Sequence, residues 1–549
     1  MPLQLLDLPG EILLICLSYL DLADIVMCLR LPNLALTRLI LEAPAIQFRI
    51  EQKACAVEET VYGEARPLFE RRKALKEREK RWRVFAPCHR QVVKTRRREW
   101  LRYDVGEDCY ALAYGCDQDP MLGDDVKYMF LDVNDKEPVW LQAAQVTEPV
   151  IDICVVSEWD LLVVVTFSVE TAGMRAIAAH LRQLSTGAVR EGMAKTIDLA
   201  QVPQRYGFPD LQVEVAGSTL AIACCFGGGE NDQDMLHLIH WPSGRALADT
   251  IPCSLTGFLF VHDALLLIPN SHTHCLDVLA LNAGPDGNAC GWMLPFRLPA
   301  LRAGHRIFWH TFECRGQPNP RTHLVDLRPT PAQTRTPFRP EPEQSRIFLM
   351  FDTLTAPTDS ADAYDTELRQ TVVVIDRARL QECFQEAYRH LEQGAPLVEV
   401  PFADWGLRAS TWLDAGPRGL GLSGYAVTGC VGTRFAALGA GADPAGPKHV
   451  RILDFNETGV ARLSKQLEAA RSDVLEATHA TIRVQPPGAG VAQEHSVFAE
   501  PLGAALGYVD ITSREAVDWK GVHLSNACIL GEKDSDVDEE NELHVLHFG

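Results

Sequence analysis

The sequence predicts an α+β multidomain protein with a small all-α N-terminal module, charged linker helices and a large, mainly β body. Three observations predict this organisation. The first fifty residues read as short apolar helices, the next fifty are rich in charge, and from residue 101 short apolar runs alternate with turns. We therefore expect a helical module over 1–48, linker helices over 49–100 and a β-rich body over 101–549.

The N-terminal module is predicted to contain three short helices. Pro9 and Glu11 mark the start of the first helix, because the helix dipole favours an acidic residue in the first turn. Asp21 suits the cap of the second helix. Pro32 should end that helix, since the residue before a proline is disfavoured in helical conformation. A third helix is expected over residues 33–42.

Three helices of this length enclose too small a core to bury all of their aliphatic side chains. The module should therefore present an apolar surface to a partner. A motif runs through it, made of Leu8-Pro9, Glu11-Ile12, Leu17, Ser18, Leu20 and Asp24-Ile25. Over residues 5–48 this pattern resembles the F-box, from which the end of the second helix and the third helix depart. The alternative is a helical hairpin that folds onto the rest of the chain.

Resemblance to the F-box implies a substrate-receptor subunit of an SCF-type ubiquitin ligase. Such a subunit binds the Skp adaptor, and through it the cullin scaffold, while its β body would hold an unknown protein substrate. The chain itself would not be an enzyme; it would supply proximity. Its overall texture is similar to the large F-box families of mushroom-forming fungi. The expected adaptor contacts are Leu8, Pro9, Ile12, Leu13, Cys16, Leu17, Leu20, Leu22, Ile25 and Val26.

The linker is strongly basic, although the chain as a whole is acidic. Residues 64–102 contain 15 Lys or Arg and 5 Asp or Glu, which is a local charge of +10 against −21 for the whole chain. Leu68, Leu75 and Trp82 recur at heptad distance, which predicts a helix with a solvated polar face. Glutamates interleave the basic residues and the body is acidic, so nucleic acid is not an expected partner.

The β body contains a repeated pattern of strand pairs. Apolar strands open near Leu161, Leu220 and Leu265, at intervals of 59 and 45 residues. Uninterrupted runs of Leu, Val and Ile are typical of strands buried on both faces. The repeat predicts an irregular β-propeller with six or seven blades, and a sandwich pair or an irregular β-solenoid is the alternative. We expect a proline-rich loop over 315–345 and an acidic tail over 532–542.

The sequence offers little support for catalysis or metal binding. None of the 16 cysteines forms a Cys-x-x-Cys pair, and His272 and His274 lack a third ligand nearby in sequence. Nucleophile-elbow and zinc-protease motifs are absent. We expect no cofactor and no metal. Two other functions stay open: a β-propeller enzyme, and an F-box interaction protein that acts outside ubiquitination.

The chain is expected to work in the cytoplasm, the nucleus or both. No apolar run approaches the ~20 residues that span a bilayer. The N-terminal segment also lacks the basic flank of a signal peptide. No membrane partner is therefore expected.

Overall fold

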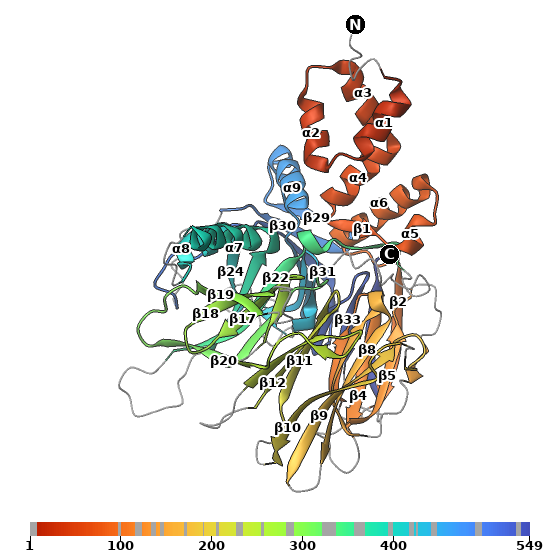
Figure 1. Cartoon of the computed structure of the whole chain (residues 1–549). Coiled ribbons are helices and arrows are strands. Elements are labelled where there is room, and N and C mark those ends of the chain that lie inside the picture. Colours follow the sequence, from red (N-terminus) through yellow and green to blue (C-terminus); the bar gives the residue numbers. More distant parts are fainter. Residues whose placement is uncertain are drawn as a thin grey trace.

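A computed structural model gives the fold of the chain. The residues that it describes are 8–96, 100–115, 123–132, 139–142, 148–169, 173–189, 192–204, 208–226, 234–253, 257–281, 290–320, 336–355, 368–393, 399–416, 422–423, 427–440, 447–488, 497–533 and 540–549. The predicted fold class is confirmed. Within these ranges, a helical module projects from one face of a seven-bladed β-propeller (Figure 1).

The first four blades follow one another along the chain as antiparallel sheets. Blades 1 and 2 merge into one sheet, because β5 also pairs with β7. The strands of blades 1 and 2 are β3 (Trp100–Val105), β4 (Cys109–Gly115), β5 (Gly123–Phe130), β6 (Leu141–Gln142), β7 (Val150–Val156), β8 (Leu161–Val169), β9 (Met174–Gln183) and β10 (Thr196–Pro203). Those of blades 3 and 4 are β11 (Asp210–Ala216), β12 (Thr219–Cys225), β13 (Asp234–His240), β14 (Arg245–Ala246), β15 (Ile251–Cys253), β16 (Leu259–His262), β17 (Leu265–Asn270), β18 (Cys275–Leu281) and β19 (Cys290–Arg297).

Blades 5 and 6 are less regular. Blade 5 consists of β20 (His305–Arg315), β22 (Arg346–Thr355), β23 (Leu368–Asp376) and β24 (Ser410–Asp414). Blade 6 orders its strands as β25 (Leu422–Ser423), β27 (Arg434–Ala440), β28 (Lys448–Asp454), β31 (Tyr508–Val517), β30 (Ala480–Gln485) and β29 (Val474–Glu476), with β26 (Cys430–Val431) beside β27. The alternatives of a sandwich pair or a solenoid are therefore excluded.

The predicted apolar strands are confirmed as the second strands of blades 2, 3 and 4. They are β8, β12 and β17, which begin at Leu161, Thr219 and Leu265. Every residue from 161 to 167 is buried. This burial arises because β8 has a hydrogen-bonded strand on each side and a neighbouring blade on each face, which also explains its lack of polar alternation.

The last blade closes the ring with strands from both ends of the body. It contains β32 (Gly521–Leu524), β33 (Cys528–Lys533), β34 (Glu540–His547) and β2 (His89–Arg96). Strand β2 pairs with β34 through eight residue pairs, from His89↔His547 to Arg96↔Glu540. The predicted boundary at residue 101 is therefore corrected, because the propeller takes its outermost strand from the segment expected to be linker.

The module contains the three predicted helices and a fourth. They are α1 (Gly10–Ser18), α2 (Leu22–Arg30), α3 (Leu34–Glu42) and α4 (Pro44–Ala54). The Asp21 carboxylate caps α2 by accepting from the amide of Asp24 at 2.8 Å, and α2 ends before Pro32 as expected. Asn33 caps α3 in the same way, with the amide of Leu36 at 2.9 Å. Ile46 of α4 packs in the module core and Ile50 packs against it, so the module extends beyond residue 48.

The predicted linker folds into more than helix. It contains β1 (Val57–Glu59), α5 (Val61–Glu64) and α6 (Leu68–Val84). Strand β1 pairs with β21 (Phe338–Pro340), which belongs to the segment expected to be a proline-rich loop. Residues 321–335 of that segment lie outside the described residues. The acidic stretch 532–542 is corrected from a tail to a connection between β33 and β34, of which 534–539 are not described.

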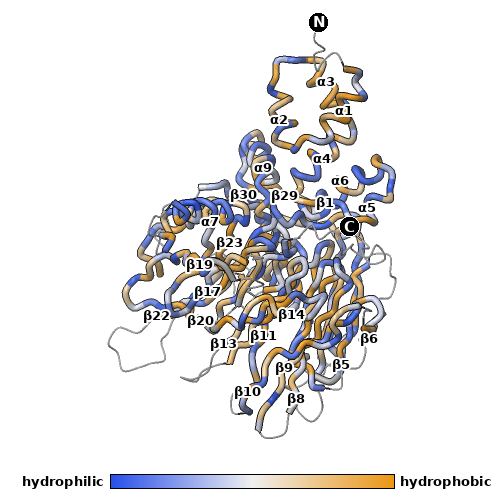
Figure 2. The backbone as a smooth tube through the Cα atoms, in the orientation of Figure 1, coloured by the Kyte–Doolittle hydropathy of each residue, from blue (hydrophilic) through white to orange (hydrophobic). Residues whose placement is uncertain are grey.

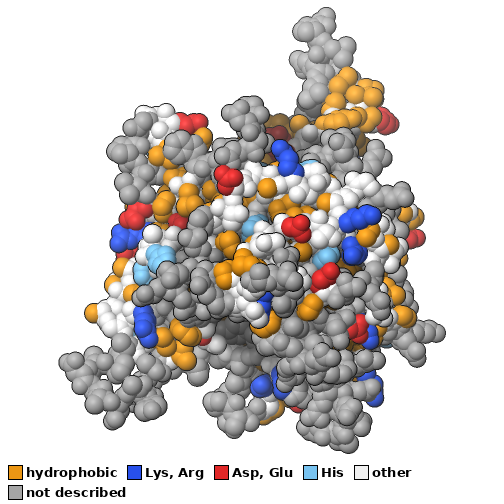
Figure 3. Space-filling model, turned by 60° about the horizontal axis from the view of Figure 1, so that its bottom comes forward, with side chains coloured by type: hydrophobic (Ala, Val, Ile, Leu, Met, Phe, Trp, Pro, Cys, Tyr) orange, Lys and Arg blue, Asp and Glu red, His pale blue; other side chains and the backbone are white. Residues whose placement is uncertain are grey.

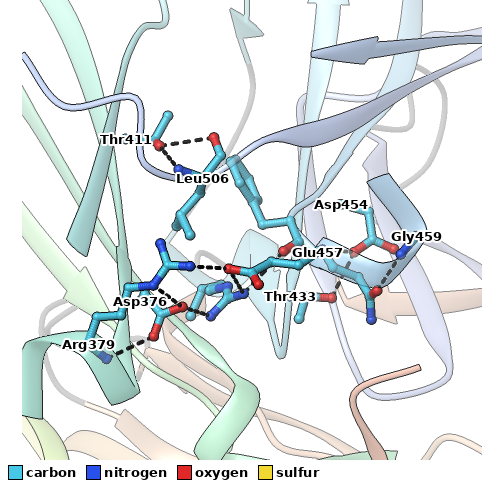
Figure 4. A network of polar contacts seen from close by, with 11 residues as sticks. Asp376, Arg379, Thr411, Thr433, Asp454, Glu457, Gly459 and Leu506 are labelled. Atoms are coloured by element: carbon cyan, nitrogen blue, oxygen red, sulfur yellow. Dashed lines mark hydrogen bonds and ion pairs between the residues drawn. The ribbon is translucent and has the colours of Figure 1, made fainter. Parts of the chain in front are cut away.

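Three further helices lie on the propeller beside the module. They are α7 (Arg377–Glu392), α8 (Phe402–Ala409) and α9 (Glu457–Ala470). Figure 4 shows how polar contacts join α7 and α9. Arg379 of α7 donates to the Glu457 carboxylate at 2.7 Å, and Asp376, which caps α7, pairs with Arg346 at 2.5 Å.

Helix α6 is anchored to the propeller through its buried face. Trp82 stacks on Phe548 with ring centroids 4.1 Å apart, and the Arg434 guanidinium lies 4.7 Å from the Trp82 ring centroid. The Arg434 guanidinium also donates a hydrogen bond to the Glu79 carboxylate of α6 at 2.7 Å. Arg78 donates to the backbone oxygen of Asn526 at 2.9 Å. On the other side of α6, Lys73, Glu77 and Lys80 are exposed, so the helix has the expected solvated polar face and buries Arg78 on the side toward the propeller.

Replacing Trp82 with alanine should destabilise the chain, because it removes both ring contacts and leaves a cavity. We expect a loss of about 3–5 kcal/mol in the free energy of unfolding. Denaturant melts of Trp82→Ala and of the control Phe69→Ala measure it. Phe69 is on the same helix but 74% exposed. Equal stability of the two variants would contradict the anchoring role.

Candidate protein-binding surfaces

The helical module has a small core of its own. Its buried apolar side chains come from all four helices and are Leu17, Ile25, Leu36, Ile40, Ala43 and Ile46. Arg49 of α4 adds polar contacts, donating to the backbone oxygens of Ser18 and Leu20 at 2.9 Å each. These carbonyls lie at the end of α1, where no helical amide satisfies them. The module is therefore a defined unit held on α4.

One face of α1 is apolar and exposed. Ile12, Ile15, Cys16 and Tyr19 occur at positions i, i+3, i+4 and i+7, so they share one side of the helix. The exposed fractions of Ile12, Ile15 and Tyr19 are 42%, 53% and 85%. Leu13 and Leu17 on the other side are buried. Figure 2 shows hydrophobic residues along α1, whereas α6 is mainly hydrophilic.

Further exposed apolar side chains lie on α2, at its end and at the start of α3. Val26 and Met27 are 38% and 57% exposed, and Leu31 and Leu34 are 52% and 88% exposed. We call the α1 face together with these four side chains the apolar face of the module. Isolated exposed aliphatic residues are ordinary on a protein surface, but these eight exposed apolar side chains between residues 12 and 34 indicate a binding surface.

The ten residues predicted as adaptor contacts divide into three groups. Pro9, Ile12, Cys16 and Val26 are exposed, and Leu8, Leu20 and Leu22 are half-buried. Leu13, Leu17 and Ile25 are buried inside the module, so they support the surface and do not form it. The prediction also omitted five members of the apolar face, which are Ile15, Tyr19, Met27, Leu31 and Leu34. The i, i+3, i+4, i+7 spacing from Ile12 could have identified Ile15 and Tyr19.

The apolar face is connected to the propeller through successive ion pairs. Glu51 of α4 accepts two hydrogen bonds from Arg72 of α6, at 2.9 and 2.6 Å. Lys53 pairs with Glu341 at 2.5 Å, next to the β1–β21 sheet. Together with the buried contacts of α6, these bonds join the module to the body through α4, β1 and α6. These contacts therefore fix the position of the apolar face relative to the propeller.

A central cavity of about 870 Å³ runs between the innermost strands of the propeller. One end of the cavity, its open end, lies at the first residues of these strands, where the Asp210 side chain is 90% exposed. At the far end, Arg339 of β21 neighbours Glu107 and Glu158. The lining carboxylates are Asp104, Glu107, Asp152, Glu158, Asp210, Glu214, Asp234 and Glu313, and the lining guanidiniums are those of Arg102 and Arg315.

Hydrogen bonds arrange the middle of this cavity. The Asp104 carboxylate accepts from the backbone amides of Val105 and Val155, at 2.8 Å each. The Glu214 carboxylate accepts from Asn319 at 2.5 Å and from Gln317 at 3.0 Å. Burial nevertheless raises the pKa of both carboxyl groups, because few solvent or cationic groups stabilise their charge.

Behind Thr428 of the cavity wall, a hydroxyl, an imidazole and a carboxylate lie in series. Thr428 Oγ1 is 2.6 Å from His523 Nδ1, and His523 Nε2 is 2.5 Å from Glu532 Oε1. This order is that of a catalytic triad. However, Thr428 and His523 are 4% and 2% exposed, and Thr428 also contacts the Tyr103 hydroxyl at 3.3 Å. The series joins blades 6, 7 and 1, so we assign it a structural role.

Among the described residues, no group of three or more His, Cys, Asp or Glu side chains is arranged to hold a metal ion. His272 and His274, considered from the sequence, lie in and beside the turn between β17 and β18. Within the same ranges, no helix has both the length and the apolar character needed to span a bilayer.

Comparison with known proteins identifies no relative by sequence. No protein-family model matches the chain, and no curated protein matches it. The F-box resemblance therefore depends on the motif residues alone.

Solved structures with a similar arrangement include the WD40 domain of SCAP from fission yeast, at 9% identity and a TM-score of 0.34. The match covers 84% of this chain and 98% of that one. A putative 6-phosphogluconolactonase from Bacteroides uniformis is 8% identical with a TM-score of 0.33, over 80% and 95% of the chains. The WD40 propeller of Doa1 is 8% identical with a TM-score of 0.25, over 52% and 81%. With scores this low, the propeller assignment depends on the sheet topology.

Asp152 should make the stability of the chain depend on pH. Burial, with smaller contributions from Asp104 and Asp210, raises its pKa to about 7, although Arg102 opposes the shift. The folded state therefore binds this proton more tightly than the unfolded state, and stability falls as pH rises from about 4 through about 7. Asp152→Asn mimics the protonated form. We expect a higher melting temperature than that of the natural chain at about pH 8 and a smaller difference at about pH 5.

Thermal melts of Asp152→Asn, the natural chain and the exposed control Asp249→Asn at both pH values test this expectation. The control should melt like the natural chain throughout. A gain for Asp152→Asn that is the same at both pH values would show that the carboxyl group is ionised throughout this range.

Proposed function

We propose that the chain is a substrate-receptor subunit of an SCF-type ubiquitin ligase, with the apolar face of the module as its contact for a Skp-type adaptor. One observation supports this most: the exposed apolar side chains lie on the same helices that carry the F-box-like motif. Removing apolar surface from water contributes ~25 cal/mol per Å², so binding a partner over this face is favourable. The body is a β-propeller, which offers several loop-lined faces to a substrate.

The mechanism follows from the geometry of attachment. The module and the propeller are joined by buried contacts at Trp82, Arg434 and Asn526, and by the pairing of β1 with β21. An adaptor on the apolar face would therefore have a fixed position relative to a substrate on the propeller. A fixed position raises the effective concentration of a substrate lysine near the ubiquitin thioester, and that chemistry belongs to other subunits.

Exposed residues provide the sharpest test of the adaptor contact. The double variant Ile15→Asp with Met27→Asp places two charges on the apolar face, where both side chains are more than half exposed. We expect co-expression with a Skp adaptor followed by size-exclusion chromatography to give a stoichiometric complex for the natural chain. The double variant should elute alone, because a buried unpaired carboxylate is costly.

A matched control makes the same chemical change elsewhere. Met293→Asp with Leu368→Asp alters two exposed apolar residues of the propeller, 46% and 55% exposed, and should leave the complex intact. Substitutions at Leu13 and Leu17 are unsuitable because both side chains are buried. A natural chain that ignores the adaptor would overturn the proposal and favour a propeller enzyme. A complex that forms but recruits no cullin would indicate an F-box interaction protein outside ubiquitination.

A further inference from the structure

The central cavity is lined by far more acidic than basic side chains. Eight carboxylates and two guanidiniums line it, an excess of six acidic groups (8 − 2). The guanidiniums already have partners within the wall. Arg315 donates to the backbone oxygen of Val105 at 2.7 Å and lies 3.8 Å from the Asp104 carboxylate, and Arg102 pairs with Asp210 at 3.2 Å. With Arg339, which lies beside Glu107 and Glu158, three guanidiniums stand against eight carboxyl groups, so the cavity is strongly acidic.

Buried polar atoms without partners point to a missing ligand. Asn319 is 5% exposed; its amide nitrogen donates to Glu214 and to the backbone oxygen of Val215, but Oδ1 has no hydrogen-bond partner. Ser157 is 9% exposed, and its Oγ likewise has none. Both residues line the cavity, and both oxygens can accept a hydrogen bond from a cationic N–H group. Unpaired buried polar atoms are rare in native proteins and usually mark an absent water, ion or ligand.

An aromatic wall completes the cavity near its open end. Trp309 is half-buried and stacks on Phe312, with ring centroids 5.1 Å apart and an angle of 16°. Both rings line the cavity. Aromatic faces attract cations, and ligand cavities typically have volumes of about 300–1,000 Å³. The size, charge and aromatic content of this cavity thus fit one organic cation with an extended chain.

The open end of the cavity faces away from the helical module. Asp152 lies on β7 and Asp210 begins β11, at the start of the innermost strands, whereas α6 contacts Asn526 after the end of the innermost strand β32. Figure 3 views the body from the side turned away from the module. A ligand could therefore enter while the apolar face of the module is covered.

We propose that the central cavity binds an organic cation, either a lysine or arginine side chain of a peptide or a free polyamine, with Asp152, Asp104 and Glu214 as its carboxylate partners. The ammonium or guanidinium group would form charge-assisted hydrogen bonds with these carboxylates. Its alkyl chain would pass Trp309. This binding does not depend on the adaptor, so it can hold or fail independently of the proposed ubiquitin-ligase function.

The proposal predicts binding that weakens as pH falls. Burial raises the pKa of Asp152 to about 7, against the opposing charge of Arg102 and with additions from Asp104 and Asp210. Protonation removes the negative charge that attracts the cation. The dissociation constant should therefore rise as pH decreases from about 8 to about 6.

Isothermal titration of the full chain tests the proposal, with spermidine and with a short acetylated peptide that contains one arginine. The same peptide with citrulline in place of arginine is the neutral comparison. Binding of the arginine peptide alone would identify a peptide as the source of the cation, and binding of spermidine alone would identify a free polyamine. Binding of both would support the cation site. Absence of binding to both, or equal binding of the citrulline peptide, would overturn the proposal.

Variants separate the cavity from general attraction to an acidic protein. Asp152→Asn should raise the dissociation constant about tenfold, as expected for loss of a charge-assisted contact. Asp210→Asn should also weaken binding. Because the Asp210 side chain is 90% exposed, this substitution should not disturb folding. The exposed control Asp249→Asn should leave the constant unchanged. Equal effects of all three substitutions would place the ligand on the outer surface and overturn the proposal.

Discussion

The pairing of β2 with β34 closes the propeller, and the rest of the structure depends on it. Strand β2 comes directly after α6, so the strand that completes the last blade also fixes the end of the helix that carries the module. Phe548, which follows β34, supplies the ring on which Trp82 of α6 stacks. Loss of this pairing would therefore open the ring and release the module together.

This coupling gives the module a mechanical relation to the body that a flexible linker would not provide. Three layers of contact connect them. The module core continues into α4 through Ile46, Arg72 of α6 binds Glu51 of α4, and Glu79 of α6 binds Arg434 of blade 6. Charge pairs contribute little net stability, and we infer that these two pairs favour one geometry of the module over others. A fixed separation between two binding surfaces is what a scaffold requires.

The sequence predicted the elements whose signals are local. The apolar runs that became β8, β12 and β17 are continuous, and the capping residues of α2 and α3 stand beside the helices they begin. Helix α9 also had a local signal that was overlooked: Asn456 caps it, and Val460 and Leu463 are buried at helical spacing.

The missed features depend on residues far apart in the sequence. Val57 pairs with Pro340, and His89 pairs with His547; no local pattern encodes either pairing. The cavity was missed for the same reason. Asp104, Asp152 and Glu214 each lie on a different strand, and in the sequence of each strand the residue looks like ordinary polar alternation. Likewise, Leu13 and Leu17 look as suitable for a partner as Ile12 and Ile15 until the helix packing is known.

Hydrogen–deuterium exchange of the full chain, with and without a Skp adaptor, tests the central claim most directly. The account predicts slower exchange over residues 10–34 when the adaptor is present, because amides under a covered surface open less often. Exchange in α6 and in the propeller strands should be unchanged, since these contacts are already formed. Unchanged exchange over 10–34, or protection confined to the propeller, would contradict the account.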